Sequence, residues 1–174
     1  LSSSYNIANQ PTLPSQIAMD GITTAMQYDT KGNITQITRT GGGITQTETF
    51  TYDALNNVTS HTDALNHTTT YTYNGTGNLR QITDALGNQT EISYNGSGQP
   101  TQTVNPSGVQ TTFGYNSFGN LNQITLPALG ISSGTLYDAV SRVIKTTNPN
   151  SQATEFTYDA NDNMLTNKDA LNYT

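Results

Sequence analysis

Two histidines beside an aspartate are the side chains in this sequence most able to do chemistry. His61 and His67 flank Asp63, and imidazole nitrogens together with a carboxylate are common zinc ligands. The trio is therefore a candidate metal site. However, His61 takes the place that Ile82 holds in another copy of the repeat described below. We therefore interpret both histidines as variable polar positions and predict no metal.

Recurrent aspartates could serve as calcium ligands or as acid–base groups. They are Asp29, Asp53, Asp63, Asp84, Asp138, Asp159 and Asp169. Asparagine stands at the equivalent position in other copies, such as Asn74 and Asn116. Because asparagine keeps the oxygen acceptor but cannot titrate, this exchange favours a role in turns over one in catalysis. We predict no catalytic residue and no cofactor.

Tyrosines set the period of the chain. Seven of them recur at intervals of 21–24 residues, each followed by Asp or Asn: Tyr28, Tyr52, Tyr73, Tyr94, Tyr115, Tyr137 and Tyr158. A fixed period of this length is typical of a repeat architecture, in which each unit stacks on the next. The rings could also stack on sugars. We favour packing within the sheet, because tyrosine joins a large apolar ring to a hydroxyl that can reach water.

Two turn signals punctuate each repeat. The first follows the tyrosine, as in residues 29–33, and the second comes about half a period later, as in residues 84–87. Asp or Asn opens each turn, and glycine at the fourth position can adopt a positive φ. The predicted turn glycines are Gly32, Gly77, Gly87, Gly98, Gly108 and Gly119, with Asn56, Ser141 and Asp162 in their place elsewhere. Residues 39–44 and 126–134 break the rhythm, and we predict that both are surface loops.

Strand patterns fill the space between the turns. Residues 69–73 alternate as Thr-x-Tyr-x-Tyr, which predicts a half-buried strand. In the other strand Leu79 and Ile82 have opposite parity, so it either contains a bulge or presents apolar groups to both faces. The predicted fold is all-β: tandem repeats of about 21 residues form an antiparallel β-hairpin meander, as a curved open sheet or a segment of a β-shell.

We divide the chain into an irregular leading segment, residues 1–25, and tandem repeats over residues 26–174, with the last unit truncated. Within the first part, residues 17–26 could be an irregular strand, the degenerate end of an earlier copy, or a helical turn. The chain lacks an initiating Met and ends within a repeat. We therefore expect a fragment of a longer protein whose export signals lie elsewhere.

Composition argues against several functions. Hydrophobic residues make up 32% of the 174 residues and charged residues 10%, which predicts a thin sheet without a large core. With a net charge of −6 and six Lys and Arg in all, the chain has no cationic cluster for nucleic acid or an anionic membrane surface. It has no cysteine, hence no disulfide. No apolar run approaches the ~20 residues of a membrane span.

The repeated motif resembles that of the Rhs or YD-repeat family. Its parts are Tyr-Asp-x-x-Gly-Asn, Leu/Ile-x-x-Ile-Thr-Asp-Ala-x-Gly-Asn and Thr-x-x-Tyr-x-Tyr-Asp, and they cover about residues 26–174. The family includes bacterial Rhs polymorphic toxins, the B and C components of toxin complexes, and teneurins. The resemblance implies a β-sheet ribbon that spirals into a hollow shell, which in bacterial members encloses a C-terminal toxin domain. The family's cleavage and plug segment has no counterpart here.

Our leading hypothesis is a non-enzymatic wall segment of such a shell, enclosing a toxin or cargo in a secreted or cell-surface bacterial protein. Its partners would be further YD repeats of the parent chain and the enclosed toxin domain. One alternative is an extracellular adhesin that presents the tyrosine face and residues 126–134 to glycans or a protein partner. The other is a self-assembling fragment that forms oligomers or fibres, because unpaired sheet edges can template pairing with another copy.

Overall fold

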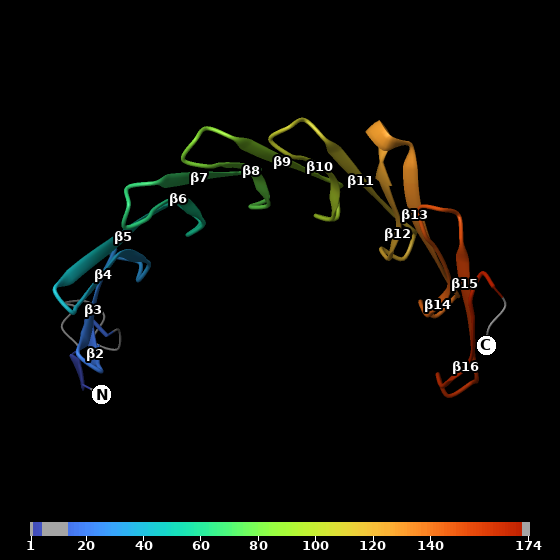
Figure 1. Cartoon of the computed structure of the whole chain (residues 1–174), viewed down its shortest axis with the longest axis horizontal. Helices are drawn as coiled ribbons and strands as arrows, with labels where there is room; N and C mark the ends of the chain where they lie inside the picture. The colour runs from blue at the N-terminus through green and yellow to red at the C-terminus, as the bar shows by residue number, and fades with distance from the viewer. Residues whose placement is uncertain (1, 5–13, 172–174) are drawn as a thin grey trace. The chain divides into compact units, whose positions relative to one another are not determined.

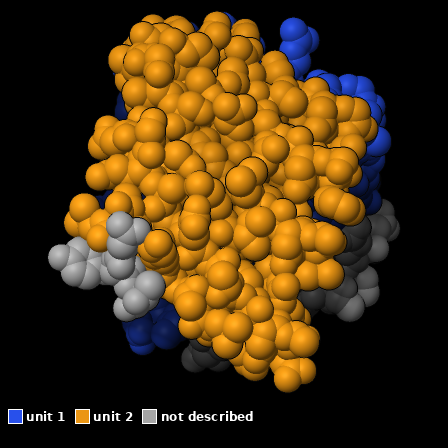
Figure 2. Space-filling view, turned by 90° about the vertical axis from the view of Figure 1, so that its right-hand side faces the viewer, with its two compact units in different colours: residues 1–89 blue, residues 90–174 orange. Residues whose placement is uncertain are grey.

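The computed structural model describes residues 2–4 and 14–171, and most of the Pro-containing start of the chain lies outside them. The chain divides into two compact units, residues 1–89 and 90–174 (Figure 2). The strands of the first unit are β1 (Ser2–Ser4), β2 (Gln16–Met19), β3 (Ile22–Tyr28), β4 (Ile34–Gly41), β5 (Ile44–Tyr52), β6 (Val58–Thr62), β7 (Thr68–Tyr73) and β8 (Leu79–Thr83).

The second unit begins in β9 and has the same pattern of hairpins (Figure 1). Its strands are β9 (Gln89–Tyr94), β10 (Pro100–Val104), β11 (Gln110–Tyr115), β12 (Leu121–Leu126), β13 (Ile131–Tyr137), β14 (Val143–Thr147), β15 (Ala153–Tyr158) and β16 (Met164–Lys168). A single 3₁₀ turn, η1 (Pro127–Leu129), is the only helical element among the described residues.

Within each unit every strand pairs antiparallel with the next strand along the chain, as β6 does with β7 and β14 with β15. This order confirms the predicted all-β antiparallel meander. Residues 17–26, for which three interpretations were open, belong largely to β2 and β3. Asp20 and Gly21 join these two strands with φ values of 52° and 77°. Two successive positive φ angles are typical of a tight two-residue hairpin turn.

A β-bulge lies beside each of the repeat tyrosines. In β8, Leu79 pairs with Tyr73, but the next pair joins Gln81 to Thr72, so Arg80 is an extra residue. Because an extra residue resets the alternation of side chains, the first and fourth residues of the strand face the same side of the sheet. Of the two explanations for the opposite parity of Leu79 and Ile82, the structure therefore shows the bulge. The same register shift occurs at Tyr28, Tyr52, Tyr94, Tyr115, Tyr137 and Tyr158.

The sheet has no closed core: no side chain is fully buried in the part of the chain whose burial the structure describes, residues 14–171. β7 shows the usual pattern, with Thr68, Thr70 and Thr72 exposed and Tyr71 and Tyr73 half-buried. One face is therefore an apolar, half-covered stripe and the other is polar. Stability must come mainly from backbone ladders and from cross-strand side-chain pairs, each worth about 0.2–1 kcal/mol.

The prediction of a surface loop at residues 39–44 was wrong. β4 continues to Gly41 and β5 starts at Ile44, so only two residues form the turn. Gly42 and Gly43 have φ values of 59° and 78°, a conformation that glycine adopts without steric cost. The insertion therefore lengthens a hairpin. The loop prediction for residues 126–134 was also wrong in part: Leu126 ends β12, β13 starts at Ile131, and only residues 127–130, which include η1, form the connection.

Candidate functional site at the tyrosine edge

We call the edge of the sheet at which the seven repeat tyrosines end their strands the tyrosine edge. A five-residue turn follows each tyrosine. In the first, the N–H of Asp29 donates to the carbonyl of Asn33 (2.9 Å) and the N–H of Gly32 donates to the carbonyl of Asp29 (3.2 Å). The side-chain Oδ1 of Asp29 accepts from the N–H groups of Lys31 (2.8 Å) and Asn33 (2.9 Å). One side-chain oxygen thus links the third and fifth residues of the turn to the first and adds to its two backbone hydrogen bonds.

This turn recurs on both edges of the sheet. On the tyrosine edge its first residues are Asp29, Asp53, Asn74, Asn95, Asn116, Asp138 and Asp159, and on the opposite edge they are Asp63, Asp84, Asn105 and Asn148. Asp169 also accepts from the N–H of Leu171 (2.9 Å). In these eleven turns the fourth residue has a positive φ. It is Gly32, Gly77, Gly87, Gly98, Gly108 or Gly119, or else Asn56, Asn66, Ser141, Ser151 or Asp162.

In several turns the first and fifth side chains are matched. The free carboxylate oxygen of Asp29 accepts from the amide of Asn33 (2.8 Å), and Asp138 accepts from Arg142 (2.7 Å). In contrast, the amide of Asn95 donates to the side-chain oxygen of Gln99 (3.0 Å). In these turns the fifth residue supplies a donor to aspartate or, where it is glutamine, an acceptor to asparagine. Sequence reasoning missed this matching, although comparison of the fifth positions among the repeats could have found it.

The turn carboxylates are held in the ionised form. A hydrogen bond from the fifth residue's side chain is the largest cause of the lowered pKa of Asp29, Asp53, Asp84 and Asp159. For Asp63 and Asp138 the largest cause of the lowered pKa is the backbone N–H of the fifth residue. A carboxylate whose pKa is lowered by donors of its own turn is poorly suited to donate a proton near neutral pH.

The tyrosine hydroxyls fasten each strand to the one before it. Tyr73 ends β7, and its hydroxyl donates to the carbonyl of Val58 in β6 (2.7 Å). The ladder between these two strands stops at the pair of Ser60 and Thr70, so the Val58 carbonyl lies beyond it. The hydroxyl supplies the donor that the diverging strand no longer provides. The equivalent bonds are Tyr52 to Ile34, Tyr115 to Pro100, Tyr137 to Leu121 and Tyr158 to Val143, all 2.7–2.8 Å.

At the start of the array, Tyr28 donates to the carbonyl of Pro14 (2.8 Å). Partial burial raises the pKa of the Tyr28, Tyr52 and Tyr73 hydroxyls, which keeps them protonated as donors. Tyr94 ends β9 and pairs with Pro100 across the bulge. The predicted tyrosine anchors therefore hold equivalent places at strand ends.

Successive turns along the tyrosine edge also contact one another. The fifth residue of one turn reaches the fourth residue of the next, as the amide of Asn33 does with the side-chain oxygen of Asn56 (2.9 Å). Gln99 likewise bonds the carbonyl of Gly119 (2.7 Å), Asn120 bonds Ser141 (2.8 Å) and Arg142 bonds Asp162 (2.8 Å). The Arg142 guanidinium also lies 4.9 Å from the centroid of the Tyr158 ring, a cation–π contact.

The structure does not bring the two histidines and Asp63 together as a trio. His67 pairs with Asp63 (Nδ1 to Oδ2, 3.1 Å), whereas His61 pairs with Glu48 (Nε2 to Oε2, 3.2 Å) and stacks on Phe50. Among the described residues no three or more His, Cys, Asp or Glu side chains are grouped so that they could hold a metal ion. Within the same part of the chain, no helix is long and apolar enough to cross a membrane.

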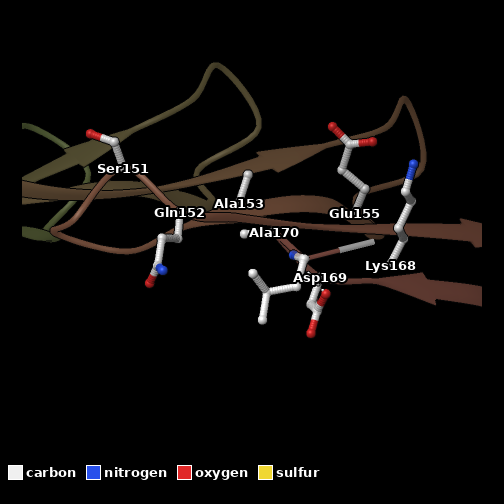
Figure 3. Close-up of a pocket in the computed structure, with 8 residues that line it drawn as sticks. Ser151, Gln152, Ala153, Glu155, Lys168, Asp169 and Ala170 are labelled. Atoms are coloured by element: carbon white, nitrogen blue, oxygen red, sulfur yellow. Dashed lines mark hydrogen bonds between the residues drawn. The ribbon is translucent and has the colours of Figure 1, made fainter. Parts of the chain in front are cut away.

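A hollow of about 530 Å³ lies between the start of β15 and the end of β16 (Figure 3). Glu155 and Lys168 lie at one end of it and Ser151 and Gln152 at the other, and Asp169 and Leu171 also line it. Glu155 forms an ion pair with Lys145 (2.9 Å). The residues that line the hollow belong to an ordinary strand pair and turn, and they form no arrangement typical of a catalytic or ligand-binding site.

Tandem hairpins with a bulge at every repeat tyrosine, and a hydroxyl bond to the preceding strand at most of them, define a β-repeat protein. The family model for the teneurin YD-shell matches residues 1–136, and that for the RHS repeat matches residues 137–171. Because the first match alone covers more than half of the sequence, the chain belongs to the teneurin YD-shell family.

Solved structures of Tc toxins have a similar fold. The crystal structure of TcdB2-TccC3-Cdc42 aligns with a TM-score of 0.73 and 18% identity, over 88% of this chain and 9% of that chain. The Photorhabdus luminescens Tc holotoxin pore aligns with a TM-score of 0.70 and 16% identity, over 88% and 9%. At these identities the likeness concerns the fold alone. No curated protein matches the chain.

Proposed function

We propose that this chain is a structural wall segment of a YD-repeat shell, which encloses a toxin or other cargo in an exported bacterial protein. The observation that carries the proposal is the tyrosine edge. There the polar groups of the repeat unit, namely the tyrosine hydroxyl, the turn carboxylate or amide, and the fifth side chain, bind either within the unit or to the next one. The repeat's most reactive groups are thus used to build a continuous sheet.

The thinness of the sheet supports a wall. A sheet with one half-covered apolar face and one threonine-rich face separates two sides without a closed core of its own. An enzyme of ordinary design would need a concave site with convergent polar groups. The turn carboxylates are instead at least partly exposed at the edges and held ionised by their own turns. These features favour a non-enzymatic role.

Further repeats of the same kind are the proposed partners. The chain spans 9% of the length of the Tc toxin chains that it resembles, so a complete shell requires many more units. The enclosed toxin domain is the second proposed partner. Location outside the producing cell, secreted or at its surface, follows from the same proposal.

Glycan binding by the tyrosine face receives less support. A sugar platform needs exposed rings and hydroxyls that are available to the ligand, but the hydroxyls of Tyr52 and Tyr73 donate to strand carbonyls and both residues are half-buried. A glycan array that compares the wild type with Tyr71→Ala and Tyr94→Ala variants separates the two functions. Binding that disappears in those variants would favour the adhesin.

Protection of a cargo tests the wall directly. The experiment uses the whole natural polypeptide that carries these repeats and follows limited proteolysis of the domain it encloses. We expect protection in the wild type and in Tyr71→Phe, and accelerated cleavage of the enclosed domain in Tyr73→Ala, because that variant opens the sheet at β6 and β7. If no domain is protected in the wild type, the shell function is wrong.

A further inference from the structure

Three charged or titratable side chains meet on the tyrosine-bearing face of the first unit, one from each of three neighbouring strands. Arg39 lies on β4, Glu48 on β5 and His61 on β6. Oε1 of Glu48 accepts a hydrogen bond from Nη1 of Arg39, and Oε2 lies 3.2 Å from Nε2 of His61. One carboxylate therefore links the strands on both sides of it.

This cluster replaces residues that other repeats use for packing. His61 stands where other units have Ile37, Ile82 and Ile124, and Glu48 stands where they have Thr69, Thr90 and Thr111. The third member of the cluster, Arg39, lies in the lengthened hairpin of β4 and β5. In a later repeat the strand equivalent to β4 is β8, and it ends at Thr83, one residue before the position that matches Arg39. Three departures from the repeat thus converge on one place.

Stacking fixes the histidine ring. The rings of His61 and Phe50 lie 4.7 Å apart with an angle of 9° between their planes, and the two residues are cross-strand partners. On the other side, His61 pairs with Thr69 of β7, whose titratable groups are Tyr71 and Tyr73. Tyrosine is neutral below about pH 9. Among the strands beside His61, Glu48 is thus the charged group that contacts it, and Arg39 contacts the same carboxylate.

We propose that Arg39, Glu48 and His61 form a pH-responsive clasp, which holds β4, β5 and β6 together more tightly once His61 is protonated. Histidine side chains change charge between about pH 5 and 8. A neutral imidazole offers Glu48 an ordinary hydrogen bond, whereas an imidazolium offers a charge-assisted one, which is roughly twice as strong. This property goes beyond the wall function: it makes the local stability of the wall depend on the pH around it.

The clasp works over a bounded pH range. Tightening occurs as the pH falls and His61 gains its proton. At still lower pH, Glu48 becomes protonated and the clasp is lost. The hydrogen bond from Arg39, followed by that from His61, lowers the pKa of Glu48, so this loss comes at a lower pH than for an ordinary glutamate.

Hydrogen–deuterium exchange of the 174-residue chain at pH 5.5 and 7.5, corrected for intrinsic exchange rates, tests the proposal. For wild type we expect amides of β4, β5 and β6 to be protected about two- to five-fold more at pH 5.5, as expected for a partly exposed ion pair. Glu48→Gln and His61→Gln should abolish that difference. His61→Ile, which restores the residue of other repeats, should keep the fold and also lose the pH dependence.

A matched control is available in the other histidine. His67→Asn places the usual fifth residue in its turn and should leave the pH dependence of β4, β5 and β6 unchanged. If Glu48→Gln retains the wild-type difference between the two pH values, the clasp is overturned. Loss of the difference in His67→Asn, but not in His61→Gln, would also contradict the proposal, because the pH dependence would then come from His67.

Discussion

The two edges of the sheet are built from the same five-residue turn but differ in what surrounds it. On the tyrosine edge every turn is followed by a bulge, and most of the tyrosines also donate a hydroxyl bond to the preceding strand. The opposite edge uses the same turn at Asp63 and Asp84, but replaces it with Asp20–Gly21, with Gly42–Gly43 and with η1 at other places. One edge is uniform and the other varies.

The difference shows where the repeat is constrained. An insertion on the tyrosine edge would shift a bulge, a ring and a turn contact together. On the opposite edge it changes one connection, which the strands accommodate by becoming longer, as β4 and β5 do. We therefore expect substitutions on the tyrosine edge to lower the free energy of unfolding more than similar substitutions on the opposite edge. Substitutions within the five-residue turn, which has the same structure on both edges, should be equally costly on either.

The largest effect should come from acid, because it acts on both edges at once. Asp29, Asp53 and Asp84 have lowered pKa values, so each contributes stability above its unfolded value near 3.9 and loses it as the pH falls through the lower folded value. Thermal unfolding from pH 6 to 2.5 should show a falling midpoint below about pH 4. A midpoint that does not change over this range would mean that the carboxylates do not hold the turns.

Removal of a ring tests the contrast between the edges. Tyr73→Ala deletes a half-buried ring and its bond to Val58, and should lower the free energy of unfolding by about 2–3 kcal/mol, below the value for a fully buried aromatic. Leu86→Ala removes an apolar side chain of the opposite edge that is 87% exposed, and should change it by less than about 0.5 kcal/mol. Denaturant unfolding measures both, and equal losses would remove the distinction.

The shared turn offers the converse test. Gly77 on the tyrosine edge and Gly87 on the opposite edge have φ values of 84° and 83°, and neither would meet another atom if a Cβ were added. Alanine should therefore cost about 1–2 kcal/mol at each position, from backbone strain alone. Unequal losses, measured by denaturant unfolding, would show that the two edges differ in the turn itself.

Much of this fold could be predicted from local signals. Asp29 and Gly32 carry their turn chemistry in their own side chains, and the alternation at residues 69–73 identifies a strand. The bulge at Arg80 could not be deduced, because opposite parity in a short strand has two explanations. Nor could the partner of the Tyr73 hydroxyl, since it depends on where the β6–β7 ladder stops. The Gly42–Gly43 turn was mistaken for a loop, because glycine permits both.

A pair of conservative substitutions in one strand tests the central claim, that the tyrosines lock each strand to the one before it through their hydroxyls. Tyr73→Phe removes only the bond to the Val58 carbonyl, whereas the Tyr71 hydroxyl, on the same strand and face, has no hydrogen bond within the described part of the chain. Denaturant unfolding should show a loss of about 1 kcal/mol for Tyr73→Phe and almost none for Tyr71→Phe. Equal stability of the two variants would contradict the claim.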